Sequence, residues 1–561
     1  MKKRTHDQAH QATTGMLLLP AVALLAGCGS SGGGGPSTDL SGRAASTIVS
    51  AQAIIAPGPT CSNGGVQVDS GIDENSNGVL DADEVDTSEV VCHGEDGFDS
   101  LIAITAAGAS VDCPNGGLRI DTGLDVDRNG VLDAGEVTQT ELMCNGNGAA
   151  GWLGAELVHT SHGIDFPRVA VDANGDAVAV WRGFDGARYS IWASRHIAGA
   201  GWSAAENITA DLGHDADYPE VAMDGSGNAV AVWQQDGGAR MNIWANRYTP
   251  GSGWGTAELI ETDDTGNAVR PRVVMDSAGN AVAVWAQFDG TRNNIRANRY
   301  TAGAGWGTSG PVGDDTGDAS VPHVAIDAGG QAVAVWRQSD GVRYNVWANR
   351  HYPGSGWGTA ELIETDDAGD PGAPQVATNA AGDAVAVWMQ FDGVQWNAWA
   401  NRYAPGAGWE GAALIETGAE DAMGPQVALD VAGNAVAVWF QSDGTRNHIW
   451  ANRYVAGAGW GTAELIETHP GNATNPQIAV DASGAATVVW EQSAETGAPY
   501  AVWMNRYVAG AAWGIARPIG SGQGHAYPRV AADGAGNVLT MWVQSEGSGA
   551  ATLWSNRYVA P

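Results

Sequence analysis

The sequence predicts an all-β protein whose main part is an eight-bladed β-propeller of four-stranded blades. First, each unit holds short apolar segments separated by Gly and Asp turns, and a strict period of such segments is typical of propeller blades. Second, the repeat region opens with a single segment that resembles the fourth strand of a unit and ends with one that resembles the third strand. The two can therefore complete one blade and close the ring. Third, the residue before the first turn recurs every 51 or 52 positions, at Asp172, Asp224, Asp276, Asp327, Asn379, Asp430, Asp481 and Asp533.

Length, composition and charge agree with this fold. A chain of 561 residues is too long for one ordinary core. Its 80 glycines and 24 tryptophans together indicate short strands and tight turns rather than disorder. The net charge of -36 argues against nucleic acid and anionic lipid surfaces as electrostatic partners. The acidity fits an extracellular, metal-binding protein, or simply a solvated acidic surface.

Residues 1–27 have the pattern of an export signal. The apolar run over residues 16–26 follows a basic start and is too short to span a bilayer. The LAGC sequence that ends at Cys28 resembles a bacterial lipoprotein signal. This resemblance implies cleavage before Cys28, lipid on its sulfur and, with Gly29 next, a lipid-anchored protein at the bacterial outer membrane or cell surface. An ordinary signal peptide is the alternative.

Residues 28–46 are rich in Gly and Ser and predict a flexible tether, which is followed by two related modules, 47–98 and 99–150. Each module has a cysteine pair with 30 residues between its members, and the copies are offset by 52. Four cysteines in an exported protein permit three disulfide connectivities. The duplication favours Cys61 with Cys92 and Cys113 with Cys144. A zinc site is the weaker reading, because CxxC pairs are missing.

Between each cysteine pair lies a 12-residue pattern of oxygen-bearing side chains around a Gly, which is what a calcium loop requires. The first loop would bind through Asp73, Asn75, Asn77, the carbonyl of Val79, Asp81 and Glu84. The second would use Asp125, Asp127, Asn129, the carbonyl of Val131, Asp133 and Glu136. An Asx-rich turn that binds nothing is the alternative. A short helix is expected after each loop, as in dockerin-like half-hands, and the calcium would be structural.

The tandem modules also resemble a cysteine-bounded domain of unknown function that occurs in bacterial surface proteins. This resemblance covers about residues 47–150 and implies no activity.

Residues 151–561 form the predicted propeller. In the sixth repeat the expected strands are 425–430, 434–440, 448–454 and 460–467. The lone strand 152–159 would pair with the last strand, 553–558, and close the ring. A seven-bladed ring with one irregular extra unit is the alternative.

Two recurrent classes of tryptophan predict packing between blades, with stacking on glycans as the alternative. One class begins the fourth strand, at Trp152, Trp202, Trp254, Trp306, Trp357, Trp409, Trp460 and Trp513. The other ends the second strand, at Trp181, Trp233, Trp285, Trp336, Trp388, Trp439, Trp490 and Trp542.

An arginine recurs near the end of each third strand. It should lie on the same ring face as the turn Asp and pair with it. These arginines are Arg195, Arg247, Arg299, Arg350, Arg402, Arg453, Arg506 and Arg557.

The opposite face carries the QxDGxR turns between second and third strands, and loops of this kind commonly hold function. Their amide, carboxylate and guanidinium groups could bind sugar hydroxyls beside an aromatic ring, although a plain Gly turn is the alternative for any one copy. The candidate ligand-binding residues are Gln287, Asp289, Arg292, Gln338, Asp340, Arg343, Gln441, Asp443, Arg446 and Trp396.

These patterns favour a monomeric, non-catalytic binding protein. Catalysis needs an asymmetric constellation, whereas almost every polar group here is expected in eightfold copies. The turns resemble the Asp-boxes of sialidase-type propellers only loosely, since their spacing differs. The blade-by-blade repetition is similar in form to lectin-type propellers, which implies a surface glycan as first ligand and an extracellular protein as second. A sialidase-like glycosidase or lyase is the alternative.

Overall fold

The computed structural model describes residues 46–55, 65–73, 85–92, 100–107, 117–124, 126, 132–133 and 135–144, and residues 151–560 apart from 199, 264, 366–368, 468, 494–499, 521–525 and 546–549. Every regular element in this part of the chain is a β-strand. Among the described residues there is no helix with the length and apolarity needed to cross a membrane.

Each N-terminal module is a three-stranded antiparallel sheet. Their orders are β1-β2-β3 and β4-β5-β6, with bounds β1 (Ser46–Ile55), β2 (Gly65–Asp73), β3 (Val85–Cys92), β4 (Ser100–Ala107), β5 (Gly117–Leu124) and β6 (Val137–Cys144). The predicted short helix after each loop is wrong. The chain instead returns as β3 or β6 and pairs with the strand before the loop, from Gly65 opposite Cys92 in the first module. Backbone groups that a helix would satisfy internally are satisfied across this hairpin.

The propeller contains eight sheets, as predicted, and the seven-bladed alternative is excluded. The first strands are β8 (Asp165–Val171), β13 (Ala216–Met223), β18 (Ala268–Met275), β23 (Ala319–Ile326), β28 (Gln375–Thr378), β33 (Ala422–Leu429), β38 (Ala473–Val480) and β42 (Arg529–Ala532). The second strands are β9 (Ala177–Phe184), β14 (Ala229–Asp236), β19 (Ala281–Phe288), β24 (Ala332–Ser339), β29 (Ala384–Phe391), β34 (Ala435–Ser442), β39 (Ala486–Ser493) and β43 (Val538–Ser545).

The third strands are β10 (Tyr189–Ile197), β15 (Met241–Thr249), β20 (Asn293–Thr301), β25 (Tyr344–Tyr352), β30 (Trp396–Ala404), β35 (Asn447–Val455), β40 (Tyr500–Tyr507) and β44 (Ala550–Val559). The fourth strand is split into two short pieces in six blades: β11 (Gly201–Trp202) with β12 (Glu206–Asn207), β16 (Gly253–Trp254) with β17 (Glu258–Leu259), β21 (Gly305–Trp306) with β22 (Gly310–Pro311), β26 (Gly356–Trp357) with β27 (Glu361–Leu362), β31 (Gly408–Trp409) with β32 (Ala413–Leu414), and β36 (Gly459–Trp460) with β37 (Glu464–Leu465). The seventh blade has β41 (Arg517–Gly520) in this place.

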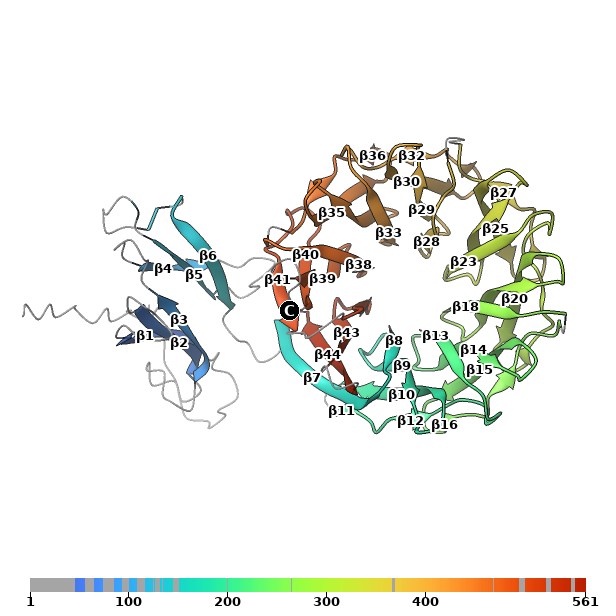
Figure 1. The fold of residues 1–561 in the computed structure, drawn as a ribbon, viewed down its shortest axis with the longest axis horizontal. Helices are drawn as coiled ribbons and strands as arrows, with labels where there is room; N and C mark the ends of the chain where they lie inside the picture. The colour runs from blue at the N-terminus through green and yellow to red at the C-terminus, as the bar shows by residue number, and fades with distance from the viewer. Residues whose placement is uncertain are drawn as a thin grey trace, which may run out of the picture. The chain divides into compact units, whose positions relative to one another are not determined.

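The ring closes as the sequence predicts. Strand β7 (Gly151–His162) is the fourth strand of the last blade and pairs with β44, Trp152 lying opposite Tyr558. The first strands are innermost, and each contacts the first strands of both neighbouring blades around the whole circle (Figure 1). The centre of the ring is therefore built from eight equivalent strands.

The hydrophobic core lies between adjacent blades. Val230 and Val232 on β14, for example, pack with Ala281 and Trp285 on β19 of the next blade. All eight tryptophans of the second strands, which lie three residues before the strand end, are at most 1% exposed. Each such ring removes roughly 150–250 Å² from water, so this class has the predicted packing role.

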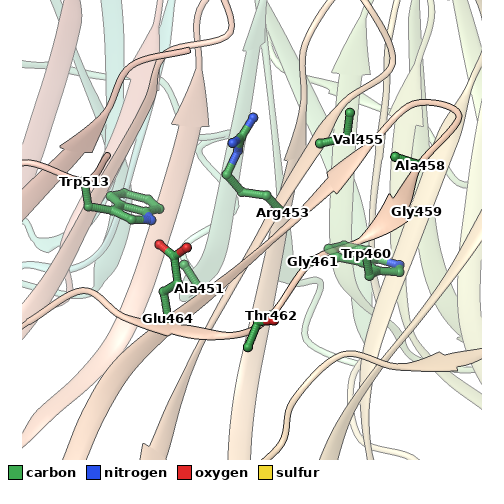
Figure 2. Close-up of a pocket in the computed structure, with 10 residues that line it drawn as sticks. All are labelled: Ala451, Arg453, Val455, Ala458, Gly459, Trp460, Gly461, Thr462, Glu464 and Trp513. Atoms are coloured by element: carbon green, nitrogen blue, oxygen red, sulfur yellow. The ribbon is translucent and has the colours of Figure 1, made fainter. Parts of the chain in front are cut away.

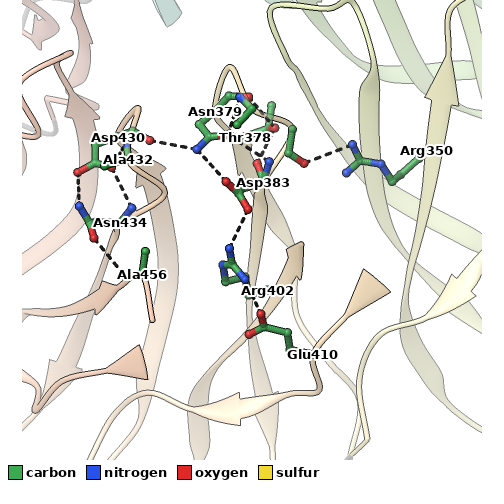
Figure 3. A network of polar contacts seen from close by, with 12 residues as sticks. Arg350, Thr378, Asn379, Asp383, Arg402, Glu410, Asp430, Ala432, Asn434 and Ala456 are labelled. Carbon is green, nitrogen blue, oxygen red and sulfur yellow. Dashed lines mark hydrogen bonds and ion pairs between the residues drawn. The ribbon is translucent and has the colours of Figure 1, made fainter. Parts of the chain in front are cut away.

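The face that carries the turns between first and second strands is held by polar contacts within and between blades (Figure 3). Asn379 donates from Nδ2 to Asp383 Oδ2 at 3.2 Å and to the carbonyl of Asp430 in the next blade at 3.4 Å. Asp383 in turn accepts a hydrogen bond from Arg402 at 2.7 Å.

The predicted pairing of third-strand arginines with the turn Asp holds in part. Arg506 pairs with Asp481 at 2.8 Å and Arg299 approaches Asp276 at 3.6 Å, whereas Arg195 pairs with Asp176, four residues beyond the turn Asp. The turn Asp mainly caps its own turn: Asp276 Oδ1 accepts the backbone N–H groups of Ala278 and Asn280. Six of the arginines also lie over a Tyr ring of the following blade: Arg195, Arg247, Arg350, Arg402, Arg453 and Arg506.

Candidate functional site at the ring centre

The acidic residues of the predicted QxDGxR turns are turn caps. Asp289 Oδ1 accepts the backbone N–H groups of Thr291 at 2.8 Å and Arg292 at 2.9 Å. The bond from Arg292 is the main reason that the pKa of Asp289 is lowered. Asp340 and Asp443 make the same pair of bonds in their own turns. These carboxylates stabilise the turn conformation.

The glutamines of these turns are buried and bonded within the scaffold. Gln287 is 1% exposed; its Oε1 accepts the indole N–H of Trp285, and its Nε2 donates to linker carbonyls. Gln338 and Gln441 are 2% and 3% exposed and accept from Trp336 and Trp439 in the same way. These amides hold the second strand to the linker before the first strand.

The remaining candidates of this face also contact their own surroundings. Arg292 donates to the carbonyl of Thr316, and Arg446 donates to the carbonyl of His469 at 3.1 Å. Arg343 lies 3.7 Å from Glu364. Trp396 is half-buried, and its ring centroid is 5.5 Å from that of Phe391. The candidate residues of each turn contact only their own blade or an adjacent linker. The structure therefore does not gather the ten residues into one site.

Most residues of the predicted lipid, disulfide and calcium sites lie outside the described part of the chain. These are Cys28, Cys61, Asn75, Asn77, Val79, Asp81, Glu84, Cys113, Asp125, Asp127, Asn129 and Val131. Asp73 ends β2, Cys92 ends β3 and Cys144 ends β6. Within the described residues no group of three His, Cys, Asp or Glu is placed to hold a metal.

The last predicted ligand of the second loop, Glu136, turns its carboxylate toward the loop backbone. Its Oε1 accepts the N–H of Val126 at 2.7 Å and its Oε2 accepts the N–H of Asp133 at 3.1 Å. A 12-residue calcium loop needs its final carboxylate at this place. Both oxygens of this carboxylate accept backbone N–H groups, and calcium in this loop stays a prediction.

One position in the repeat, the residue that follows the proline of each first strand, breaks the eightfold pattern. In all eight blades this residue is half-buried, while the proline before it is buried. Because the first strands form the innermost circle, these side chains surround the ring axis. In blade order they are Arg168, Glu220, Arg272, His323, Gln375, Gln426, Gln477 and Arg529.

A β-bulge with strained backbone lies directly before these post-proline residues in most first strands. The pairing register of β13 with β14 shifts between Asp217 and Glu220, and similar shifts occur in β8, β18, β23, β33 and β38. The residue before the proline has a positive φ in most blades: Phe166, Tyr218, Arg270, Val321, Asn475 and Tyr527. A pre-proline residue disfavours helical conformations, and left-handed backbone at a residue other than Gly costs about 1–3 kcal/mol. Such strain is concentrated at functional sites in proteins.

Three arginines and one carboxylate form the charged part of the centre. Glu220 Oε1 accepts a hydrogen bond from Arg168 Nε at 2.8 Å and another from Arg272 Nη1 at 2.5 Å. Burial raises the pKa of Glu220, but the two arginines outweigh burial and hold this pKa below its usual range. The side chains of Arg168, Glu220 and Arg272 are 16%, 15% and 32% exposed, so they remain in contact with solvent.

Arg529 adds a third positive charge without a counter-ion. It forms no ion pair with any described residue, and its Nη1 donates to the carbonyl of Pro528 at 2.8 Å. Burial first, and then repulsion from Arg168, hold the pKa of Arg529 well below its ordinary value. The centre thus carries an excess of positive charge in a chain of net charge -36.

His323 is neutral at physiological pH. Burial, followed by the charge of Arg272, lowers its pKa to about 3. Its Nδ1 accepts the backbone N–H of Val376 at 3.3 Å, which places the ring proton on Nε2. The ring therefore offers an N–H donor without a charge.

The eight side chains divide the centre into two arcs. Blades eight and one to four supply the charged residues and the histidine, and blades five to seven supply three glutamines. The expectation that almost every polar group occurs in eightfold copies fails at this position. The signal in the sequence is the residue after each first-strand proline, which varies while the proline before it and the aliphatic residue after it recur in all eight blades.

Aromatic and charged side chains lie beside the charged arc, on β8 and β13 and on the neighbouring strands β9 and β10. Phe166 stacks on Tyr218 with ring centroids 4.7 Å apart. Arg182 lies 4.3 Å above the ring of Tyr189 and pairs with Asp165 and Asp217. Blade four repeats this arginine and tyrosine, with Arg337 4.7 Å from the ring centroid of Tyr344, whereas the remaining blades carry other residues at the arginine position.

A hollow lies away from the axis, between the sixth and seventh blades. It has a volume of about 260 Å³, and Arg453, Trp460, Glu464 and Trp513 are among the residues that line it (Figure 2). Both tryptophans belong to the class that begins the fourth strand. Their rings are half-buried, and they pack in part on the Tyr that ends the third strand.

The fold and this centre define an eight-bladed propeller with unlike side chains around its axis. A duplicated module precedes the propeller in the sequence. A family described as a domain of unknown function (DUF7151) matches residues 48–92 and 99–144, which are the two modules. No curated protein matches the chain.

The solved structures that are similar to this chain share little sequence identity with it. A protein of unknown function from Dyadobacter fermentans is 13% identical, with 63% of this chain and 97% of that chain covered and a TM-score of 0.35. A polysaccharide lyase of family PL25, an ulvan lyase, is 9% identical over 66% and 96% of the two chains, with a TM-score of 0.40. An intramolecular trans-sialidase from Ruminococcus gnavus is 9% identical over 71% and 95%, with a TM-score of 0.33. At these TM-scores the similarities support no statement about what this chain binds.

Proposed function

We propose that the chain is a cell-envelope lipoprotein whose propeller binds an extracellular ligand without chemical turnover, a glycan first and a protein second. The observation that supports this function is the set of polar, partly exposed and unlike side chains at the ring centre. A ligand that enters there meets donors, acceptors and charges from all eight blades. An asymmetric set of this kind selects one ligand orientation.

The chemistry of the centre suits a sugar. Glutamine amides offer both donors and acceptors to hydroxyl groups, and the neutral His323 offers a further N–H donor. The stacked Phe166 and Tyr218 supply the aromatic surface on which an apolar sugar face can lie.

The same groups are poorly suited to proton transfer. A general acid must be protonated near the working pH, whereas two arginines keep Glu220 ionised. A general base works best with a pKa near that pH, whereas the pKa of His323 is about 3. These environments favour holding a ligand over cleaving it.

The N-terminal part would act as an anchored stalk. Lipid on Cys28 would hold the chain at the bacterial outer membrane or cell surface. Disulfides Cys61–Cys92 and Cys113–Cys144, together with calcium in the two loops, would stiffen the modules. The inward carboxylate of Glu136 supports calcium in the second loop.

A glycan array tests the binding function. The chain from residue 28 onward, with Cys28→Ser to prevent lipidation, is applied with and without calcium. We expect binding to a restricted set of glycans, with little effect of calcium on specificity. The bound glycans should be recovered intact after incubation, without cleavage products. Silence on the array combined with capture of an envelope or host protein would favour the second ligand class.

A glycosidase or lyase is the second candidate, because three arginines and a carboxylate meet at the ring centre. Incubation of array-positive glycans with the same chain, followed by mass spectrometry, distinguishes the two. Any catalytic release of a shorter glycan would contradict the non-catalytic proposal.

A further inference from the structure

We propose that the ring centre binds the carboxylate of an acidic sugar through Arg168, Arg272 and Arg529, while the opposite glutamines bind the sugar hydroxyls. This inference rests on the proposed glycan-binding function and specifies its ligand class. It assigns a role to the position after the first-strand proline in each blade.

Among the post-proline residues of the ring centre, three arginines face one carboxylate, Glu220, and a bound anion would offset the remaining positive charge. Two of the three guanidinium groups converge on one oxygen atom, Glu220 Oε1. Arg529 has no carboxylate within ion-pair distance among the described residues, yet it lies close enough to Arg168, Arg272, Glu220 and Glu491 for their charges to act on it. An unpaired charge that is removed from bulk water is costly, and a bound anion offsets that cost.

The geometry of arginine favours a carboxylate as that anion. A guanidinium has five N–H donors in a planar fork. Glu220 occupies one donor of Arg168 and one of Arg272, and Arg168 Nη1 also donates to the carbonyl of Pro167 at 2.9 Å. The remaining donors, together with those of Arg529, can bind a second carboxylate at the same place. The nearby Glu220 keeps the surplus of positive charge at the ring centre small, so the centre suits one carboxylate rather than a polyanion.

The opposite arc supplies the partners for the rest of the sugar. Gln426 and Gln477 donate from Nε2 to the carbonyl of their own preceding proline, at 3.0 and 2.8 Å. These bonds fix the amide groups, and no described residue donates a hydrogen bond to their amide oxygens. Those oxygens can accept hydroxyl groups of a ligand whose carboxylate lies on the arginines.

The test measures binding of three small probes to the full chain with Cys28→Ser, by calorimetry at constant pH and ionic strength. The probes are sodium glucuronate, glucose and sodium sulfate. We expect glucuronate to bind about tenfold or more tightly than glucose, because glucose lacks the carboxylate. Sulfate should bind more weakly than glucuronate, since it cannot use the glutamine arc.

Variants connect the binding to the centre. Arg529→Gln should weaken glucuronate binding by about tenfold or more. Its melting temperature should equal or exceed that of the parent chain, because an unpaired charge is removed. The matched control is Arg188→Gln, which changes an arginine of a peripheral turn that pairs with Asp211 and should leave glucuronate binding unchanged.

Each other outcome overturns the inference in a distinct way. Sulfate that binds as tightly as glucuronate would make the centre a general oxyanion site. Glucuronate binding that survives Arg529→Gln would place the sugar elsewhere. Failure of glucuronate alongside array binding of neutral glycans would overturn the carboxylate assignment and leave the proposed function intact, whereas failure of both would overturn both.

Discussion

A single position in the repeat, the residue after the first-strand proline, decides what the ring centre presents. Its neighbours are constrained: the proline is buried, and the residue before it is held in left-handed backbone in most blades. The post-proline side chain itself lies on the innermost strand and is half-buried in every blade, outside the buried core between blades. It is therefore free to differ between blades, and the change from Gln to Arg, Glu or His alters the centre without altering the scaffold.

His323→Gln should remove an acid sensitivity of the fold. Burial and Arg272 lower the pKa of His323 from 6.5 to about 3, with Arg168 adding to and Glu220 opposing the effect. Between these values the unfolded chain binds a proton that the folded chain does not, so stability falls as pH falls through this window. The variant carries the residue found at this position in blades five to seven and has no such loss.

Denaturant unfolding at pH 7.5 and pH 4.5 checks this prediction. The variant and the parent should be similarly stable at pH 7.5, and the variant should be more stable by about 2 kcal/mol at pH 4.5. The control is His214→Gln, whose side chain is 43% exposed and which should behave as the parent does. An equal response of His323→Gln and the parent to acid would contradict the burial of this ring.

Arg453→Ala should lower the melting temperature without affecting ligand capture. The sequence indicated an ion pair with the turn Asp, but the structure places the Arg453 guanidinium 4.0 Å from the ring centroid of Tyr507 in the next blade. Such a cation–π contact contributes about 0.5–2 kcal/mol. Arg506→Ala should cost more, because Arg506 also pairs with Asp481 at 2.8 Å. Unchanged melting of Arg453→Ala would remove the proposed inter-blade role.

At the scale of strands, the sequence predicted the first three strands of each blade well and the fourth less well. The second strand is a continuous apolar run buried on both faces, so its position follows from hydrophobicity alone. The fourth strand lies at the outer edge and pairs only at its two ends, for example at Trp460 and at Leu465. A short edge strand gains little from burial, and local backbone geometry interrupts it in a way that hydrophobic pattern does not report.

The closing strand β7 should be essential to the stability of the propeller. It supplies the fourth strand of the last blade, and Trp152 packs on Tyr558 with ring centroids 5.8 Å apart. A chain that begins at residue 163 would leave the edge of β44 unpaired and prone to association. We expect a clearly lower melting temperature and concentration-dependent aggregation, measured by calorimetry and light scattering.

A chain that begins at residue 151 is the matched control, since it lacks the same modules but retains β7. It should melt as the propeller of the longer chain does. Equal melting of the two truncated chains would show that the ring closes without β7.

At the scale of the whole molecule, the period of the sequence was sufficient to predict eight blades, but the candidate site was not predictable from it. Blade number follows from repeat count, because each blade can bury its faces only against its neighbours. The ring centre joins residues from Arg168 to Arg529, and their proximity arises only when the ring closes. The QxDGxR turns looked functional because they are polar and repeated, yet the structure shows that their glutamines and aspartates are bonded to the scaffold.

Calcium should stabilise the modules and leave the propeller unaffected, because the predicted loops lie only in residues 47–150. The carboxylate of Glu136 holds the two sides of the second loop through the N–H groups of Val126 and Asp133. A bound calcium ion would add its own bonds to the loop oxygens, so the folded module gains stability with ion concentration.

Calorimetry of the full chain, with Cys28→Ser, should therefore show a module transition that rises with calcium and a propeller transition that does not. Glu136→Gln should reduce the calcium-dependent shift of the second module, and Glu84→Gln should do the same for the first. A module transition indifferent to both calcium and these substitutions would assign the loops to plain Asx-rich turns, because only an ion couples the stability of the loop to the charge of its last residue.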